Sequence, residues 1–227
     1  MKSAEEILQQ ALRYKRYWGK KGGITVSGGE ALLQIDFVTE LFTLAKEKGV
    51  NTCLDTSGNP FTREEPFYSK FEKLMEVTDL FMLDIKEIDE DEHKKLTGQT
   101  NKNILDMATC LSDHGKAMWI RHVLVPGITD DDGQLHRLRA FIDTLKTVER
   151  VEILPYHTLG YLNGKNLGFL MHWKMWSRRP KSRWNMHGKS LFPIINPDCM
   201  NRRDIEARKK CICPNSIDGR DIKIKKT

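Results

Sequence analysis

Five short apolar segments alternate with amphipathic helical segments over the first 160 residues, and this alternation constrains the fold more than any other feature. The apolar segments are nearly continuous runs of strand-forming residues, as expected for the buried strands of a parallel sheet. Between them, apolar side chains recur at helical spacing. We therefore predict an α/β fold of five β/α units. The predicted strands are residues 23–29, 51–58, 80–86, 117–125 and 148–157, and the predicted helices are residues 3–18, 36–48, 64–77, 89–96, 103–114 and 132–145.

Polar residues stand at the end of every predicted strand. Because the carboxyl ends of parallel strands meet at one edge of a sheet, these residues are expected to share a ligand-binding rim. Taken singly, each group is better explained as an ordinary turn or a surface side chain than as a functional residue. Their recurrence on successive strands favours a binding site. The groups are Ser27-Gly28-Gly29-Glu30, Asp55-Thr56-Ser57-Gly58, Asp84 with Lys86, Arg121, and Tyr156 with His157.

Composition limits the class of protein. The chain has 227 residues, 39% of them hydrophobic and 30% charged, which is ordinary for a globular protein with a sizeable core. It contains no apolar run of ~18 residues that would predict a membrane span, and its first residues lack the apolar region of a signal peptide. We therefore expect a cytoplasmic protein. Its five cysteines are scattered and predict no disulfide framework, and Cys53 and Cys110 are expected to be core thiols.

Charge divides the chain into two parts. Residues 161–227 carry 16 Lys and Arg against 5 Asp and Glu, whereas residues 1–160 carry 21 against 26. The basic part also holds three tryptophans and has neither strand nor helix periodicity. We therefore predict a domain at residues 1–160 and a basic, disordered tail at residues 161–227.

The motifs of residues 1–160, taken in order, resemble those of one family. ITVSGGEALLQ, NTCLDTSG, VTDLFMLDIKEID, WIRHVLVPGITDDD and VEILPYHTLG occur in the order and spacing typical of the pyruvate formate-lyase activating enzymes. These are glycyl-radical activases of the radical S-adenosylmethionine (SAM) superfamily. The resemblance implies a partial (β/α)6 TIM-like barrel, here missing its first strand.

The resemblance also implies a set of SAM-binding residues. In the family, the Gly-Gly-Glu motif binds the amino acid end of SAM, a lysine suits its carboxylate, and a histidine contacts its nucleoside. A monovalent cation lies beside the SAM carboxylate, held by oxygen-rich ligands. Arg121 is a weaker candidate for ordering the cofactor or a partner. The matching SAM-binding positions are Gly28, Gly29, Glu30, Asp55, Asp84, Ile85, Lys86 and His157, and the matching cation positions are Asp55, Thr56, Met82 and Asp84.

The implied reaction is reductive. A [4Fe–4S] cluster passes an electron to SAM, which yields a 5′-deoxyadenosyl radical, and the radical removes a hydrogen from a glycine Cα. The implied partners are pyruvate formate-lyase, or a related glycyl-radical enzyme, and a small electron donor such as flavodoxin. No membrane partner is expected.

The chain departs from the family pattern at both ends. The family's Cys-x3-Cys-x2-Cys cluster loop precedes the region matched by Met1, and no such spacing occurs here. Cys199, Cys211 and Cys213 match no iron–sulfur or zinc spacing. Back-translating residues 171–190 and shifting the frame by one base gives an acidic, amphipathic sequence like the family's own ending. We therefore hypothesise a frameshift near residues 160–161.

Two other functions are compatible with the sequence. One is a non-catalytic remnant of the family, which would bind no iron or sulfide after anaerobic reconstitution. The other, ranked last, is a nucleic-acid-binding protein that uses its basic, Trp-containing tail. It predicts steeply salt-dependent binding that is lost when residues 161–227 are deleted.

Overall fold

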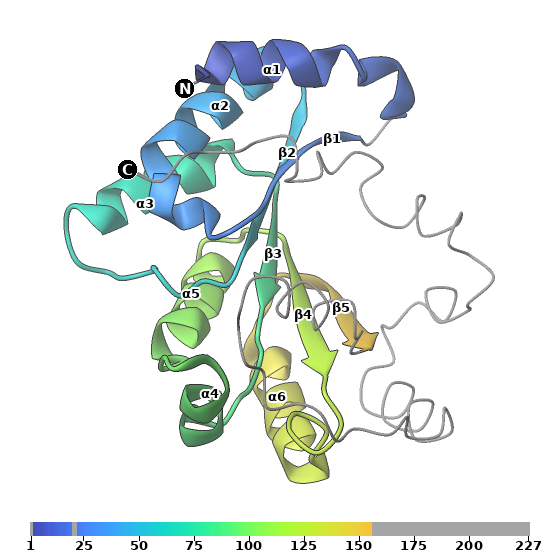
Figure 1. Ribbon diagram of the computed structural model, residues 1–227. Coiled ribbons are helices and arrows are strands. Elements are labelled where there is room, and N and C mark those ends of the chain that lie inside the picture. The colour runs from blue at the N-terminus through green and yellow to red at the C-terminus, as the bar shows by residue number, and fades with distance from the viewer. Residues whose placement is uncertain (1, 20–21, 156–227) are drawn as a thin grey trace, which may run out of the picture.

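The fold is a five-stranded parallel sheet with helices packed on one face (Figure 1). The computed structural model describes residues 2–19 and 22–155. The predicted tail at residues 161–227 lies outside this range, as do Tyr156 and His157. The elements in chain order are α1 (Ala4–Leu12), η1 (Lys15–Tyr17), β1 (Gly23–Val26), η2 (Ala31–Gln34), α2 (Ile35–Glu47), β2 (Asn51–Thr56), α3 (Phe67–Val77), β3 (Leu80–Asp84), α4 (Glu90–Thr97), α5 (Lys102–Asp113), β4 (Met118–Leu124), α6 (Asp132–Thr144) and β5 (Val148–Pro155).

The strands lie in their sequence order, β1-β2-β3-β4-β5, and every neighbouring pair is parallel. Each connection between strands contains at least one helix, as parallel neighbours require. The predicted α/β fold of five units is therefore confirmed.

The two faces of the sheet differ because side chains alternate along each strand. One face is apolar and packs against the helices; it includes Leu54, Phe81, Leu83 and Ile120, each fully buried. The opposite face carries half-buried polar and aromatic side chains. The register places Asp55 beside Met82, Met82 beside Trp119, and Asp84 beside Arg121 on this second face. The second face therefore continues from the carboxyl rim down into the sheet.

Aromatic side chains fill the layer between the sheet and helices α2 and α3. The rings of Phe61 and Phe71 meet edge to face with centroids 5.0 Å apart, and Phe71 also contacts Phe81 of β3. Burial of such rings contributes most of the stability of a layer like this one. The rim is thereby built on a rigid base.

The helix predicted at residues 3–18 is shorter than expected. It begins with a capping box between Ser3 and Glu6, as its sequence suggests, but α1 ends at Leu12 and the chain continues as the short helix η1. The turn lets Trp18 reach the core, where it is 5% exposed, while Tyr14 and Tyr17 remain exposed. Burial of the indole thus outweighs continuation of the helix.

Candidate functional site

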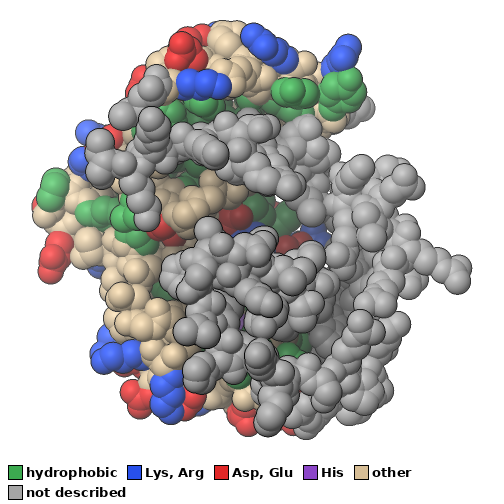
Figure 2. All heavy atoms as spheres, in the orientation of Figure 1, with side chains coloured by type: hydrophobic (Ala, Val, Ile, Leu, Met, Phe, Trp, Pro, Cys, Tyr) green, Lys and Arg blue, Asp and Glu red, His purple; other side chains and the backbone are tan. Residues whose placement is uncertain are grey.

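The predicted polar groups that lie in the described part of the chain gather at the carboxyl rim of the sheet. Figure 2 shows acidic and basic side chains near the centre of the corresponding face of the molecule. Glu30 and Asp84 both act electrostatically on Asp55, although the three residues belong to the ends of three different strands. The parallel topology therefore brings together residues that are up to 54 positions apart in the chain.

Gly28 and Gly29 form an open backbone turn after β1. Their φ angles are 98° and 52°, in the left-handed region that side chains with a Cβ rarely adopt. A Cβ built at either position would meet no atom within 4 Å. The glycines are therefore required by the backbone conformation, and the space above their peptide groups is open to a ligand.

The carboxylate of Glu30 joins the ends of β1 and β2. It accepts hydrogen bonds from the backbone N–H groups of Leu32 (3.0 Å) and Ser57 (2.9 Å), and from the hydroxyls of Thr56 and Ser57. Four donors from the protein thus surround a half-buried acid. This bracing role was not predicted from the sequence; the separation of Glu30 from Ser57 along the chain hides it.

Arg121 bridges the two aspartates of the rim. Its Nη2 pairs with Asp55, and its Nε donates to Asp84 at 2.9 Å. The three side chains are each about one-fifth exposed. Lys86 approaches Asp84 from the other side, with Nζ 3.3 Å from Oδ2, and is more exposed. The rim thus presents alternating charge, with a lysine at its outer edge.

Within this cluster, the pKa of Asp55 is raised even though Arg121 pairs with its carboxylate. Burial raises the pKa of Asp55; the charge of Arg121 opposes this shift, and the charges of Asp84 and Glu30 add to it. Burial alone would lower the pKa of Arg121, but Asp84 and Asp55 outweigh that effect and raise it. The guanidinium is therefore permanently charged, whereas burial makes the ionised form of Asp55 less favourable than it is in water.

The other predicted site residues take different positions. The Thr56 side chain is buried and its hydroxyl contacts Glu30, while Met82 lies half-buried on the polar face beside Asp55. Ile85 is fully buried, and its backbone N–H donates to the carbonyl of Arg121 at 2.9 Å.

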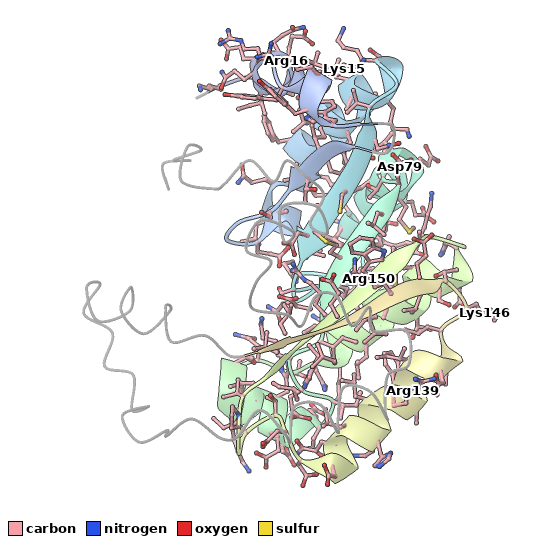
Figure 3. The ribbon with its side chains drawn as sticks, turned by 90° about the vertical axis from the view of Figure 1, so that its right-hand side faces the viewer. Lys15, Arg16, Asp79, Arg139, Lys146 and Arg150 are labelled. Carbon is pink, nitrogen blue, oxygen red and sulfur yellow. The ribbon has the colours of Figure 1, made fainter. Side chains whose placement is uncertain are left out.

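Further down the polar face lies a group that the sequence analysis missed. The guanidinium of Arg150 stacks over Trp119 at 4.9 Å from the ring centroid, and its Nε contacts Glu152 at 3.2 Å. Figure 3 shows Arg150 near the centre of the view, on β5, the strand at one edge of the sheet. The alternation of Arg150 and Glu152 along β5 was the available signal. In the register of β4 and β5, Glu152 is the partner of Arg121 and Arg150 is the partner of Trp119. This group therefore lies next to Arg121 on the polar face.

A groove of about 590 Å³ lies beside the rim, between the start of α2 and the segment that precedes α3. Its walls are mainly apolar, with one ion pair between Lys70 and Asp36. It contains none of the clustered charges, so the rim is the better candidate for the site.

The described residues do not fit an iron–sulfur cluster. Cys53 and Cys110 are buried in β2 and α5, and the other three cysteines lie beyond residue 155. No group of three His, Cys, Asp or Glu side chains suited to a metal ion occurs among residues 2–19 and 22–155. Over the same residues, no helix is long and apolar enough to span a membrane.

Comparison with known proteins identifies what this fold and rim are similar to. The profile of the Radical SAM superfamily matches residues 1–138. The chain is 56% identical over 167 residues to a pyruvate formate-lyase-activating enzyme of Streptococcus mutans, covering 74% of this chain and 64% of that protein. It is 49% identical over 168 residues to the enzyme of the same name from Listeria monocytogenes, covering 74% of this chain and 68% of that protein. The chain thus spans about two thirds of the length of these relatives.

Solved structures agree on the fold. A domain of the pyruvate-formate lyase-activating enzyme from Bacteroides vulgatus matches with a TM-score of 0.59 and 21% identity, covering 75% of this chain and 92% of that one. SuiB of Streptococcus suis, in a structure bound to S-adenosylmethionine, matches with a TM-score of 0.56 and 18% identity, covering 74% of this chain and 39% of that one. At these identities the likeness concerns the fold alone.

Proposed function

This chain belongs to the radical SAM superfamily and, within it, to the pyruvate formate-lyase activating enzymes, and from this premise we propose that its rim binds SAM for the activation of a glycyl-radical enzyme. One observation carries the proposal. The open Gly28-Gly29 turn lies at the same rim as the charged cluster of Asp84, Lys86 and Arg121. SAM carries an ammonium, a carboxylate and a sulfonium, and this rim offers both signs of charge within a few ångströms.

The residues of the rim would divide the work of holding SAM. The exposed peptide groups of Gly28 and Gly29 lie where a backbone can approach the amino acid end of the ligand. Lys86, at the outer edge, would pair with the SAM carboxylate through a charge-assisted hydrogen bond. Asp84 and the backbone of Ile85 would line the same end. Glu30 is proposed to accept a hydrogen bond from the SAM ammonium, and its bonds to the end of β2 keep the glycine turn in place. His157, outside the described residues, is proposed for the nucleoside.

A monovalent cation at Asp55, Thr56, Met82 and Asp84 forms part of the proposal. The two carboxylates and the Met82 side chain share one face of the sheet. Arg121 already supplies positive charge to both carboxylates. A bound cation would therefore add to, or displace, an existing pairing, and it would oppose the rise in the pKa of Asp55 that burial and, to a lesser extent, the charges of Asp84 and Glu30 cause.

When bound, SAM supplies the 5′-deoxyadenosyl group that the family uses to remove hydrogen from a glycine Cα. That reaction also uses a [4Fe–4S] cluster, and the described residues offer no ligand set for one. We therefore assign to these residues the binding and orientation of SAM and derive no electron-transfer step through them. The proposed partners are pyruvate formate-lyase, or a related glycyl-radical enzyme, and an electron donor such as flavodoxin, all in the cytoplasm.

We also propose that residues 1–160 form the SAM-binding domain and that residues 161–227 arose from a frameshift. The reversal of net charge near residue 160 supports this boundary. Sequencing the gene tests it. A DNA sequence without the acidic alternative frame contradicts the proposal.

SAM binding is tested by equilibrium dialysis of the whole chain with labelled SAM. We expect saturable binding that Lys86→Met weakens about tenfold or more, because a charge-assisted bond is lost. The matched control is Lys102→Met, which removes an exposed lysine paired with Glu90 and should leave the affinity unchanged. If the wild-type chain binds no SAM, or if both variants bind equally well, the proposed site is wrong.

A further inference from the structure

A buried histidine lies directly behind the charged rim. His122 follows Arg121 in β4, so its side chain points to the opposite face of the sheet. It is 2% exposed, and nothing in the proposed binding of SAM uses it. A buried titratable side chain this close to the rim calls for a physical role.

Both ring nitrogens of His122 contact backbone carbonyl oxygens. Nδ1 lies 2.8 Å from the oxygen of Ile85, and Nε2 lies 3.2 Å from the oxygen of Thr129. A carbonyl oxygen only accepts hydrogen bonds, and a neutral imidazole has a single N–H. Both contacts are hydrogen bonds only when the ring is an imidazolium. A neutral ring would leave one pair of buried acceptors facing each other.

A carboxylate that interacts electrostatically with His122 is buried as well. Glu87 is 2% exposed and follows the rim segment in the chain. Burial raises the pKa of Glu87, and the hydrogen bonds from the backbone N–H groups of Asp89 and Ile88 and the positive charge of His122 offset only part of that rise. Asp89 is itself paired with Arg137 of α6 at 3.2 Å. Arg121 and Asp84 lie on the other face of the strands and neutralise each other.

The two carbonyls that His122 contacts belong to two segments that each also bond to β4. Ile85 lies between the rim residues Asp84 and Lys86, and its N–H donates to the carbonyl of Arg121 at 2.9 Å. Thr129 closes the loop of residues 125–129. Its hydroxyl accepts from the N–H of Val125 at 2.8 Å and donates to the carbonyl of Val123 at 2.6 Å. His122 therefore connects the rim segment to this loop.

Asn101 also binds the residues that follow the Asp84–Lys86 rim segment. Its side-chain amide donates to the carbonyls of Glu87 (3.1 Å) and Ile88 (2.8 Å), and Asn101 is 2% exposed. The residues after β3 are thus fixed by buried side-chain donors in addition to the backbone bond from Ile85 to Arg121. Removing one donor would leave a buried carbonyl unpaired, which is more costly than the bond itself contributes.

We infer that His122 is a positioning residue: as an imidazolium balanced by Glu87, it holds the Asp84–Lys86 rim segment and the 125–129 loop in one arrangement. The consequence for SAM rests on the proposed function, whereas the charge state of His122 and its two hydrogen bonds do not. The inference therefore stands or falls on measurements that need no ligand.

The first test is nitrogen NMR of the whole chain labelled with ¹⁵N at histidine, at pH 7. We expect the His122 ring, identified by its absence in His122→Gln, to carry a proton on both nitrogens. Glu87→Gln should reduce the doubly protonated fraction, because the counter-charge is lost. A His122 ring with one protonated nitrogen in the wild-type chain overturns the inference.

The second test compares hydrogen exchange and SAM affinity in the same variants. His122→Gln should speed amide exchange of residues 85–89 and 125–129 by about fivefold, the effect of one hydrogen bond. The same variant should weaken SAM binding by a similar factor. The matched control, His136→Gln, alters an exposed histidine of α6 and should change neither. Unchanged exchange in His122→Gln contradicts the positioning role. If exchange and NMR respond as expected while the wild-type chain binds no SAM, the proposed function fails and this inference holds.

Discussion

The pKa of an aspartate carboxylate is shifted in opposite directions at the two ends of the sheet. At the amino end, Asp79 precedes β3 and accepts bonds from Lys46 (2.6 Å) and from the backbone N–H of Thr52 (2.9 Å). At the carboxyl end, Asp55 shares Arg121 with Asp84 and faces further negative charge from Glu30. In Figure 3, Asp79 and Lys146, which both precede strands, lie toward the same side of the molecule.

The pKa shifts express this difference. Burial acts to raise the pKa of Asp79, but its bonds to Lys46 and Thr52 outweigh burial and lower it. Burial raises the pKa of Asp55, and its acidic neighbours add to the shift. The amino end therefore uses its acid for stability, whereas the carboxyl end holds an acid that costs stability. Such a cost is typical of a site arranged for a ligand.

The largest effect is expected in the apolar layer that both ends share. Leu83 in β3 is fully buried, so Leu83→Ala should lower the free energy of unfolding by about 3 kcal/mol through lost burial and a residual cavity. Leu33→Ala is the matched control, because Leu33 is 74% exposed and its loss should change stability by less than about 0.5 kcal/mol. Urea denaturation measures both. Equal effects would mean that this layer does not support the rim.

The next effect belongs to the amino end. Asp79→Asn removes the ion pair with Lys46, and we expect a loss of about 1 kcal/mol at pH 7, limited because the pair is more than one-third exposed. Since the folded pKa of Asp79 lies below its value of 3.8 in the unfolded chain, its contribution is present above pH 3.8 and disappears as the pH falls through the folded pKa. Urea midpoints of the two proteins should differ by a constant amount above pH 3.8, and the difference should begin to shrink as the pH falls below 3.8. A difference that stays constant below pH 3.8 would contradict this account.

At the carboxyl end, replacing an aspartate by asparagine should raise the free energy of unfolding rather than lower it. Asp55 has a folded pKa above 3.8, so its ionised form opposes folding at neutral pH, and this penalty fades as the pH falls through the folded pKa. Asp55→Asn should therefore raise the urea midpoint at pH 7, by less than Asp79→Asn lowers it, and the gain should shrink in acid. A destabilised Asp55→Asn protein at pH 7 would remove the contrast between the two ends.

The smallest effect on stability is expected at Lys86. Its side chain is 41% exposed, and Asp84 keeps Arg121 as a partner when Lys86 is replaced. Lys86→Met should therefore change the free energy of unfolding by less than about 0.5 kcal/mol. Together with weakened SAM binding, that result would separate function from stability at a single residue. A large loss of stability would show that Lys86 is structural.

Sequence patterns predicted most of the fold because the apolar runs of strands and the helical spacing of apolar residues both depend on neighbouring residues. Alternation between apolar strands and amphipathic helices depends on neighbouring residues, and all five strands and the parallel order follow from it. The end of α1 was predicted less well, because the local sequence pattern does not show that Trp18 is buried in the core. The rim was predicted as a set of residues, since the carboxyl ends of parallel strands meet at one edge.

By itself, the sequence determined the type and order of the elements and the side chains available at the rim, since both are encoded in runs of adjacent residues. Only the tertiary structure decided how those side chains pair. That Glu30 braces β2, that Arg121 joins two aspartates, and that His122 contacts two carbonyls all depend on residues separated by 7 to 66 positions. Hydrogen bonds and ion pairs act over a few ångströms, so the partner of a charged group is set by the packing of the sheet and not by its neighbours in the chain.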